Sequence, residues 1–375
     1  MFYPPLLRSF VVLLILQLSP QVLAVAPADV QPAGNYQYEN EPRGEWLPVP
    51  IPMSNPTLGS GLQGVLLYLH PEKPGDDPET PTATSGLAGM YTDSDSKAVG
   101  IFHDNYFAND KYRLKLMAGV GDLNLDFYGI GDKNFGFRVG YNIRPVVSYL
   151  RFMVRVPGTK NSYMGVSHLY ADATLKFRGD LTLDPERRIT LPALEFDSRT
   201  SSLGAHYALD TRNDGYYPTK GTYTTLSATR DQPEWGSQYT FTRWNAVYRQ
   251  YIPLTVKQTL AVKANLSDVN GEPPFYFLSS LQMRGFAGGR YLDDTSLSTH
   301  AEWRYKFSER WGTVAFAEAG WTGESIDELF SSDQILSYGV GLRWQPIASK
   351  QLNLAVDVAE STDDRALYLR VGEAF

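Results

Sequence analysis

The chain has 375 residues, of which 43% are hydrophobic, 20% charged and 13% aromatic, and this composition excludes a disordered protein. It contains no cysteine, which excludes a disulfide framework and cysteine-ligated zinc or iron–sulfur centres. The net charge is -7 and the basic residues are scattered rather than grouped, so nucleic acid is not an expected partner.

Residues 1–26 have the pattern of a secretory signal peptide. Arg8 precedes the apolar run 10–18, and small residues follow that run, so we expect cleavage after Ala24 or Ala26. The run is well short of the ~20 apolar residues that a membrane-spanning helix needs, which disfavours an uncleaved anchor. The exported chain is then a soluble protein or a transmembrane β-barrel, whose short segments hydropathy does not detect.

Two regions follow the signal peptide. Residues 27–56 contain seven prolines and are expected to form an extended periplasmic segment that precedes the barrel. From residue 57 to the last residue, alternation with period two predicts sixteen strands and no long amphipathic helix. The expected strands are 57–70, 84–93, 97–108, 111–121, 136–144, 146–156, 161–177, 200–210, 221–230, 237–251, 257–267, 295–307, 311–320, 335–345, 351–360 and 366–375.

The predicted strands each have an apolar and a polar face. In 335–345, for example, apolar residues from Leu336 to Trp344 occupy every second position. A soluble β-sandwich would give the same alternation. The tryptophans favour a membrane protein, because Trp311 and Trp321 lie ten residues apart on one face, which is ~33 Å of strand. With a tilt of ~40° this projects to ~25 Å, the height of an outer-membrane apolar band.

The last strand strengthens the membrane interpretation. Leu367, Leu369, Val371 and Phe375 share one face, and Phe375 is the final residue of the sequence. Many outer-membrane barrels end in this way, and their assembly machinery is thought to read the last strand. Glu373 departs from the usual pattern. We therefore predict an all-β fold, a transmembrane antiparallel β-barrel of sixteen strands, with twelve or fourteen as alternatives.

Loop lengths provide a check on this topology, because such barrels have long outer loops and short periplasmic turns. With both chain ends periplasmic, the expected outer connections are 71–83, 178–199, 268–294, 321–334 and 361–365. The expected turns are 94–96, 157–160, 211–220, 251–256, 308–310 and 346–350. Residues 122–135 are long for a periplasmic turn.

The sixth outer loop carries a motif. Its residues Met283, Arg284, Gly285 and Phe286 resemble the Arg-Gly-Phe/Tyr signature of the BamA/TamA superfamily of outer-membrane assembly and translocation barrels, also called the bacterial surface antigen family. The segment from Asp210 through Arg212 and Pro218 to Gly221 resembles a hairpin of the same family, although its residues also suit an ordinary turn. Residues 127–131, together with Glu302 and Glu318, are similar to further family positions.

This resemblance implies that the signature loop folds into the lumen, where Glu302 and Glu318 hold Arg284. A planar guanidinium can bond two carboxylates, which suits such a role. Family members that insert or secrete proteins usually carry periplasmic POTRA domains. Barely thirty residues separate the signal peptide from the first predicted strand, so we expect a member that lacks them.

Other chemistry has little support in the sequence. The five histidines have no ligand-like spacing, so no metal or cofactor is expected. No Gly-x-Ser-x-Gly elbow is present, which disfavours a lipid-modifying enzyme. Acidic loop residues are best interpreted as solvated surface. Basic residues on the polar faces either favour anion passage or form a charge network that closes the interior, namely Arg243, Arg249, Lys263, Arg304 and Arg343.

Together these features predict a non-enzymatic barrel in the outer membrane of a Gram-negative bacterium. Its expected role is to assist insertion or translocation of proteins or lipids at that membrane. The alternative is a pore-forming or structural surface barrel without insertase activity. Expected partners are outer-membrane lipids and lipopolysaccharide, the assembly machinery for its own insertion, and client proteins or further copies of the chain.

Overall fold

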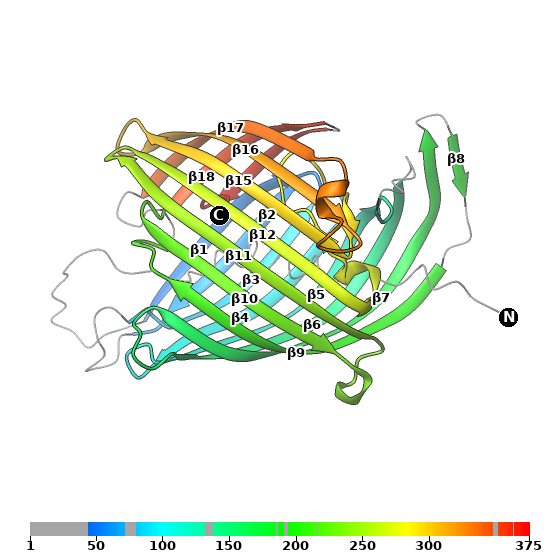
Figure 1. Cartoon of the computed structure of the whole chain (residues 1–375), viewed down its shortest axis with the longest axis horizontal. Coiled ribbons are helices and arrows are strands. Elements are labelled where there is room, and N and C mark those ends of the chain that lie inside the picture. The colour runs from blue at the N-terminus through cyan, green and yellow to red at the C-terminus, as the bar shows by residue number, and fades with distance from the viewer. Residues whose placement is uncertain are drawn as a thin grey trace.

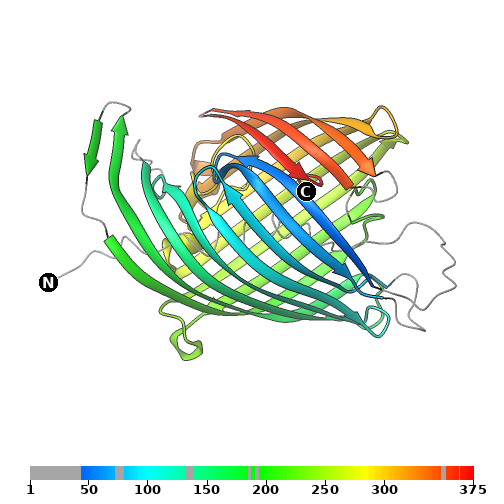
Figure 2. The ribbon, with the colours of Figure 1, turned by 180° about the vertical axis from the view of Figure 1, so that it is seen from behind.

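The computed structural model describes residues 44–71, 80–131, 138–184, 187–190, 194–215, 217–347, 352–362 and 364–375. Sixteen strands form a closed antiparallel barrel in which each strand pairs with the next and the last meets the first (Figures 1 and 2). The predicted fold class and strand number are thus confirmed. Across the described part of the chain, no helix has the length and apolarity needed to span a membrane.

The barrel strands, in chain order, are β1 (Glu45–Asn55), β2 (Gly59–Leu69), β3 (Thr84–Thr92), β4 (Lys97–Phe107), β5 (Tyr112–Phe127), β6 (Arg138–Arg155), β7 (Ser162–Asp184), β9 (Leu194–Asp210), β10 (Gly221–Asp231), β11 (Thr240–Thr255), β12 (Gln258–Glu272), β15 (Thr295–Lys306), β16 (Trp311–Gly323), β17 (Ile335–Ile347), β18 (Leu352–Ser361) and β19 (Arg365–Val371). The short strand β8 (Arg187–Thr190) pairs with the end of β7. Short 3-10 helices are η1 (Pro233–Trp235), η2 (Phe275–Phe277) and η3 (Leu329–Ser331).

The predicted number of strands is correct although one strand was missed, because another strand was counted as two. The proline-rich segment 27–56 was placed before the barrel, but residues 45–55 form β1, which pairs with β2 along its whole length. The segments 136–144 and 146–156 were taken as two strands, but β6 runs through Pro145 without a turn. The ladder between β5 and β6 skips Arg144 and Pro145, where proline has no N–H to donate.

Because the first strand was missed, several connections also lie at the opposite end of the barrel from the one predicted. The β2–β3 connection lies at the same end as the chain terminus, and the β3–β4 turn lies at the opposite end, so both placements were wrong. The β5–β6 connection lies at that opposite end beside the β12–β15 connection, which explains why it seemed too long for a turn. The motif-bearing connection remains the sixth at its end, because the missed strand and the divided strand offset each other.

Strand faces follow the predicted alternation. The outward side chains of β17 are 39–62% exposed, and they are Leu336, Tyr338, Val340, Leu342 and Trp344. Between them, Ser337 and Arg343 are buried in the interior. An apolar exterior around a polar interior reverses the arrangement of a soluble protein and is typical of a transmembrane barrel.

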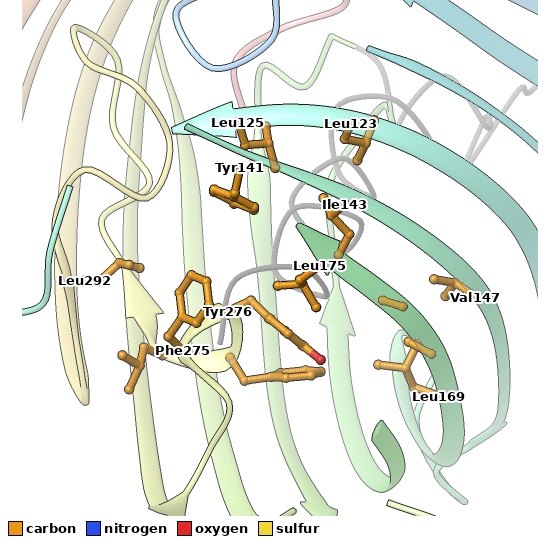
Figure 3. Close-up of a cluster of buried hydrophobic side chains, with 14 of the residues drawn as sticks. Leu123, Leu125, Tyr141, Ile143, Val147, Leu169, Leu175, Phe275, Tyr276 and Leu292 are labelled. Atoms are coloured by element: carbon orange, nitrogen blue, oxygen red, sulfur yellow. The ribbon is translucent and has the colours of Figure 1, made fainter. Parts of the chain in front are cut away.

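An apolar cluster fills the interior beneath the β12–β15 connection. Phe275, Tyr276 and Phe277 of η2 pack against inward residues of β5, β6 and β7, including Tyr141 and Leu175 (Figure 3). The rings of Tyr141 and Phe275 lie 6.1 Å apart. This packing anchors the first part of the connection inside the barrel and positions the motif that follows it.

Candidate functional site

The motif lies on a hairpin inside the barrel. Strands β13 (Ser279–Ser280) and β14 (Leu292–Asp293) pair with each other and form its stem. We call the enclosed residues 281–291 the signature loop. Gly285 and Gly289 have positive φ angles of 102° and 79°, which glycine adopts without the strain that a side chain would add. The stem and these glycines present Arg284 to the part of the wall formed by β15, β16 and β18.

Arg284 meets three carboxylates on that wall. Its Nε donates to Glu318 at 2.6 Å, and its backbone N–H donates to the other oxygen of Glu318 at 2.6 Å. Its Nη1 donates to Glu302 at 2.8 Å and to Asp357 at 3.1 Å. The guanidinium also stacks on Phe316, 3.3 Å from the ring centroid. With 5% of its surface exposed, Arg284 is a buried cation whose charge these three groups offset.

The contacts of Arg284 belong to a larger set, which we call the charge network. Glu302 also accepts from Arg304, Asp357 accepts from Arg343 and Arg370, and Glu373 accepts from Arg343. Four guanidinium groups thus face four carboxylates. A buried charge is costly unless it is paired, so the balance of this set is what allows it to lie inside the barrel.

The signature loop is also held through its backbone. Gly285 N–H donates to the Tyr368 hydroxyl of β19 at 2.9 Å, and the Ser361 hydroxyl donates to Gly285 O at 3.0 Å. Gly288 N–H donates to the Thr57 hydroxyl at 2.7 Å, in the connection between β1 and β2. The loop therefore touches the last strand and the first connection, on both sides of the closure of the barrel.

The neighbours of Arg284 in the motif are also packed. Phe286 is buried and meets the Tyr291 ring edge-on, with centroids 5.0 Å apart. Met283 lies beside Gly320 of β16, where a Cβ would stand 2.5 Å from the Met283 sulfur. The absence of a side chain at residue 320 therefore makes the space that the loop occupies.

The family-like hairpin lies at the opposite end of the barrel. Arg212 donates to Asp210 through Nε at 2.9 Å and Nη2 at 2.7 Å. Burial lowers the pKa of Arg212, but the hydrogen bonds and charge of Asp210 outweigh it, so the pKa lies above its ordinary value. Gly221 has a φ of 106° where the turn rejoins β10. Pro218 O accepts a long bond of 3.4 Å from Arg304, which connects the hairpin to the charge network.

The C-terminal residues depart from the predicted pattern. Leu367 points outward and is 48% exposed, and Leu369 lies opposite Ser54. The strand ends at Val371, however, and Gly372 turns the chain with a φ of 88°. Phe375 is buried in the interior, where it packs against Tyr251 and Ala261 instead of continuing the outward row. The prediction that Phe375 shares one face with Leu367, Leu369 and Val371 was wrong, because the ion pair between Glu373 and Arg343 draws the tail inward.

Sequence reasoning missed part of the charge network. Asp357 and Tyr368 were not identified as partners of the loop, nor Arg370 as a partner of Asp357, although each has the inward parity of its strand. Glu373 was noted only as an exception to the terminal pattern. The alternation of faces along each strand indicates that these residues point inward. It does not indicate which inward residues lie at the same height in the barrel.

Of the five basic residues considered for the lumen, Arg304 and Arg343 belong to the charge network. Arg243, Arg249 and Lys263 instead line a cavity of about 510 Å³ beside the signature loop. Throughout the described ranges, no group of three or more His, Asp or Glu residues is arranged to hold a metal ion.

Comparison with solved structures agrees with this architecture. The chain is similar to BamA from Haemophilus ducreyi lacking POTRA domains 1–3, with a TM-score of 0.59 and 18% identity over 88% of this chain and 70% of that one. For CdiB from Acinetobacter baumannii the TM-score is 0.55 at 12% identity, over 88% of this chain and 59% of that one. For CdiB from Escherichia coli the TM-score is 0.55 at 14% identity, over 87% of this chain and 62% of that one.

At these identities the similarities establish the fold. The chain spans about three fifths of the two CdiB chains. No curated protein sequence matches it.

A family model adds evidence from the sequence. The model of the Omp85 superfamily domain matches residues 86–375, which include the family-like hairpin, the signature loop and the strands of the charge network. Membership implies a location in the bacterial outer membrane. It also agrees with the resemblance to BamA and TamA drawn from the motifs. The chain therefore belongs to the Omp85 superfamily.

Proposed function

We propose that this barrel assists the insertion or translocation of proteins or lipids at the outer membrane without acting as an enzyme. The observation that carries the proposal is the closure between β1 and β19, which we call the seam. Only Ser54 and Leu369 are in register across it, whereas β1 and β2 share eleven register pairs. Opening the barrel at the seam breaks far fewer hydrogen bonds than opening it between β1 and β2.

Prolines explain why the seam is weak. Asp93 N–H donates to Ser60 O at 2.8 Å, so even-numbered residues of β2 direct their backbone groups toward β3. Even-numbered residues of β1 lie opposite them and therefore direct their backbone groups toward β19. Pro48, Pro50 and Pro52 are even-numbered and have no N–H to offer. Ser54 keeps its N–H and is the residue that pairs.

The two edges of the seam consequently differ. Gly372 N–H donates to Asn353 O of β18 at 2.7 Å, so odd-numbered residues of β19 direct their backbone groups toward β1. None of these is proline, which leaves the β19 edge with both donors and acceptors. An incoming extended segment is therefore bonded by β19, while β1 provides mainly carbonyl oxygens. The signature loop bridges the seam through Tyr368 and Thr57, and its release accompanies opening.

The outward face supports the partners expected from the sequence. Its exposed apolar side chains contact outer-membrane lipids and lipopolysaccharide. The same surface requires the cell's assembly machinery to place the barrel in the membrane. Client proteins and further copies of the chain act at the seam.

Cysteine pairs test the seam. We would join it with Ser54→Cys and Leu369→Cys, and use Ser54→Cys with Ser60→Cys across β1 and β2 as the matched control. Liposomes containing each oxidised protein are given an unfolded β-barrel client, and folded client is measured over time. We expect the seam disulfide to abolish the acceleration and a reductant to restore it, with no effect of the control disulfide. Equal acceleration by the seam-joined protein would overturn the proposal.

The cavity favours a second candidate function, a pore. It lies beside the signature loop and is lined by basic side chains, so loss of the loop anchor would widen it. Planar-bilayer conductance of the wild type and Arg284→Ala separates the two candidates. Steady conductance of the wild type, together with no client insertion, would favour the pore.

A further inference from the structure

Two cations face each other inside the barrel without a carboxylate between them. Arg249 of β11 and Lys263 of β12 are directly opposite in the ladder, and both positions face inward. Among the described residues, no Asp or Glu forms an ion pair with either. The Nε of Arg249 is buried and has no described hydrogen-bond acceptor. Like charges directly opposite on neighbouring strands repel each other.

Nearby carboxylates are already occupied. The same row continues from Lys263 to His300 and then to Glu318. Glu318, however, bonds Arg284 at 2.6 Å and lies 3.2 Å from His300. Each of the two cations instead lies near an aromatic ring. Arg249 lies 5.4 Å from the Tyr223 centroid, and Lys263 lies 5.8 Å from that of Phe375.

The surroundings of the pair have the features of a ligand site. Both residues line the cavity of about 510 Å³, which is large enough for a small anion with an attached group. Neutral polar side chains line it next to the pair. Asn245 and Asn265 are two of them, and they bond each other at 3.0 Å. The cavity therefore combines excess positive charge with further hydrogen-bonding groups.

We propose that Arg249 and Lys263 bind the phosphoryl group of an anionic ligand in this cavity. The Cβ atoms of two directly opposite residues lie about 5 Å apart. One tetrahedral oxyanion can bridge two side chains at that separation. A guanidinium bonds two of its oxygens through parallel N–H groups, and an ammonium bonds a third as a point charge. A group with close to two negative charges offsets both cations, which a single carboxylate does not.

The phosphoryl group belongs either to a free phosphate compound or to a lipid headgroup, and two probes distinguish these sources. Purified protein in detergent is titrated with inorganic phosphate and, separately, with dihexanoyl phosphatidic acid, using calorimetry and ³¹P NMR. Binding of inorganic phosphate identifies the free compound as the source. Binding of the lipid analogue alone identifies the headgroup.

Variants assign the binding to the pair. We expect Arg249→Gln and Lys263→Gln each to weaken binding at least tenfold, and the double variant to lose it. Arg230→Gln is the matched control, because Arg230 lies in β10 and bonds Gln232 and Thr242 on the exterior. Unchanged affinity in the double variant, or no binding of either probe to the wild type, overturns the assignment.

A measurement on the wild type alone tests the proposal even when the variants fail to fold. Phosphate should raise the temperature at which the folded band converts to the unfolded band in gel electrophoresis, compared with chloride at equal ionic strength. An equal conversion temperature in the two salts would contradict the proposal. Arg249 and Lys263 lie on β11 and β12 rather than on the strands of the seam, and the binding test does not depend on client insertion.

Discussion

Arg284 and Asp357 are separated by 73 residues in the chain, yet their side chains meet at 3.1 Å inside the barrel. Asp357 also bonds Arg343 and Arg370, so one carboxylate of β18 joins the signature loop to two neighbouring strands. The position of the loop is therefore coupled to β17 and β19, and through β19 to the seam.

Arg284→Ala should release the signature loop. Three carboxylates would lose their shared cation in a region where water is restricted, and removal of one partner from a buried pair costs about 3–5 kcal/mol. We expect a lower conversion temperature in heat-modifiability gels and new protease cleavage within residues 281–291. Arg284→Lys should rescue only part of the loss, because an ammonium does not reproduce the fork of donors. Wild-type protease resistance in Arg284→Ala would show that the loop is held by other contacts.

Asp357→Asn should destabilise the barrel far more than a surface substitution. It removes a negative charge that faces three guanidinium groups, leaving excess positive charge in the interior. Glu360→Gln is the control, because its ion pair with Arg365 is exposed and such pairs contribute at most about 1 kcal/mol. Urea unfolding followed by tryptophan fluorescence compares the two. Equal midpoints would mean that the charge network adds little to stability.

Gly285→Ala should displace the signature loop even though the change is one methyl group. A Cβ there would lie 2.9 Å from the Ser337 hydroxyl and 3.0 Å from the Ser361 Cβ, at a φ of 102°. Gly158→Ala separates crowding from backbone strain, because Gly158 has a φ of 80° and no atom within 4 Å of its Cβ position. Both variants bear a strain of about 1–3 kcal/mol, and only Gly285→Ala adds crowding. A larger decrease in conversion temperature for Gly285→Ala is the expected result.

Replacing Pro48, Pro50 and Pro52 by valine should strengthen the seam. Three N–H donors would then face β19, and each hydrogen bond formed contributes about 1 kcal/mol. We expect slower client insertion and more complete cross-linking between cysteines at residues 54 and 369. Pro253→Val, on β11, is the control away from the seam. Client insertion at the wild-type rate in the triple variant would argue against proline as the cause of the weak closure.

Phe375→Ala should lower the stability of the folded barrel, because the ring is buried against Tyr251 and Ala261. Truncating a buried phenylalanine costs about 3 kcal/mol or more. Leu367→Ala, which changes an outward side chain, should have a smaller effect on unfolding in detergent. Urea midpoints of both variants provide the measurement. A larger loss for Leu367→Ala would mean that the exterior of β19 contributes more than the interior tail.

The sequence by itself determined the strand class, the two faces of each strand and the inward parity of Glu302 and Glu318, and the motif identified Arg284. These follow from local alternation and from short motifs, because side chains alternate across any extended strand. Local patterns also produced the errors at β1 and β6, because a proline-rich segment was placed outside the barrel at β1 and Pro145 was taken as a break between two strands at β6. Proline excludes only the hydrogen bond on one side, and a strand that faces a weak seam tolerates its loss.

Only the tertiary structure decided which inward residues meet. Strand tilt and register place Asp357 beside Arg284, turn Phe375 into the interior and leave Arg249 facing Lys263. These relationships depend on how the whole barrel closes, because the register of each strand pair shifts the position of every strand that follows it around the barrel. No single segment of the sequence specifies that cumulative shift. Charge balance in the interior was therefore settled by long-range geometry, while the alternation of faces was set by each strand alone.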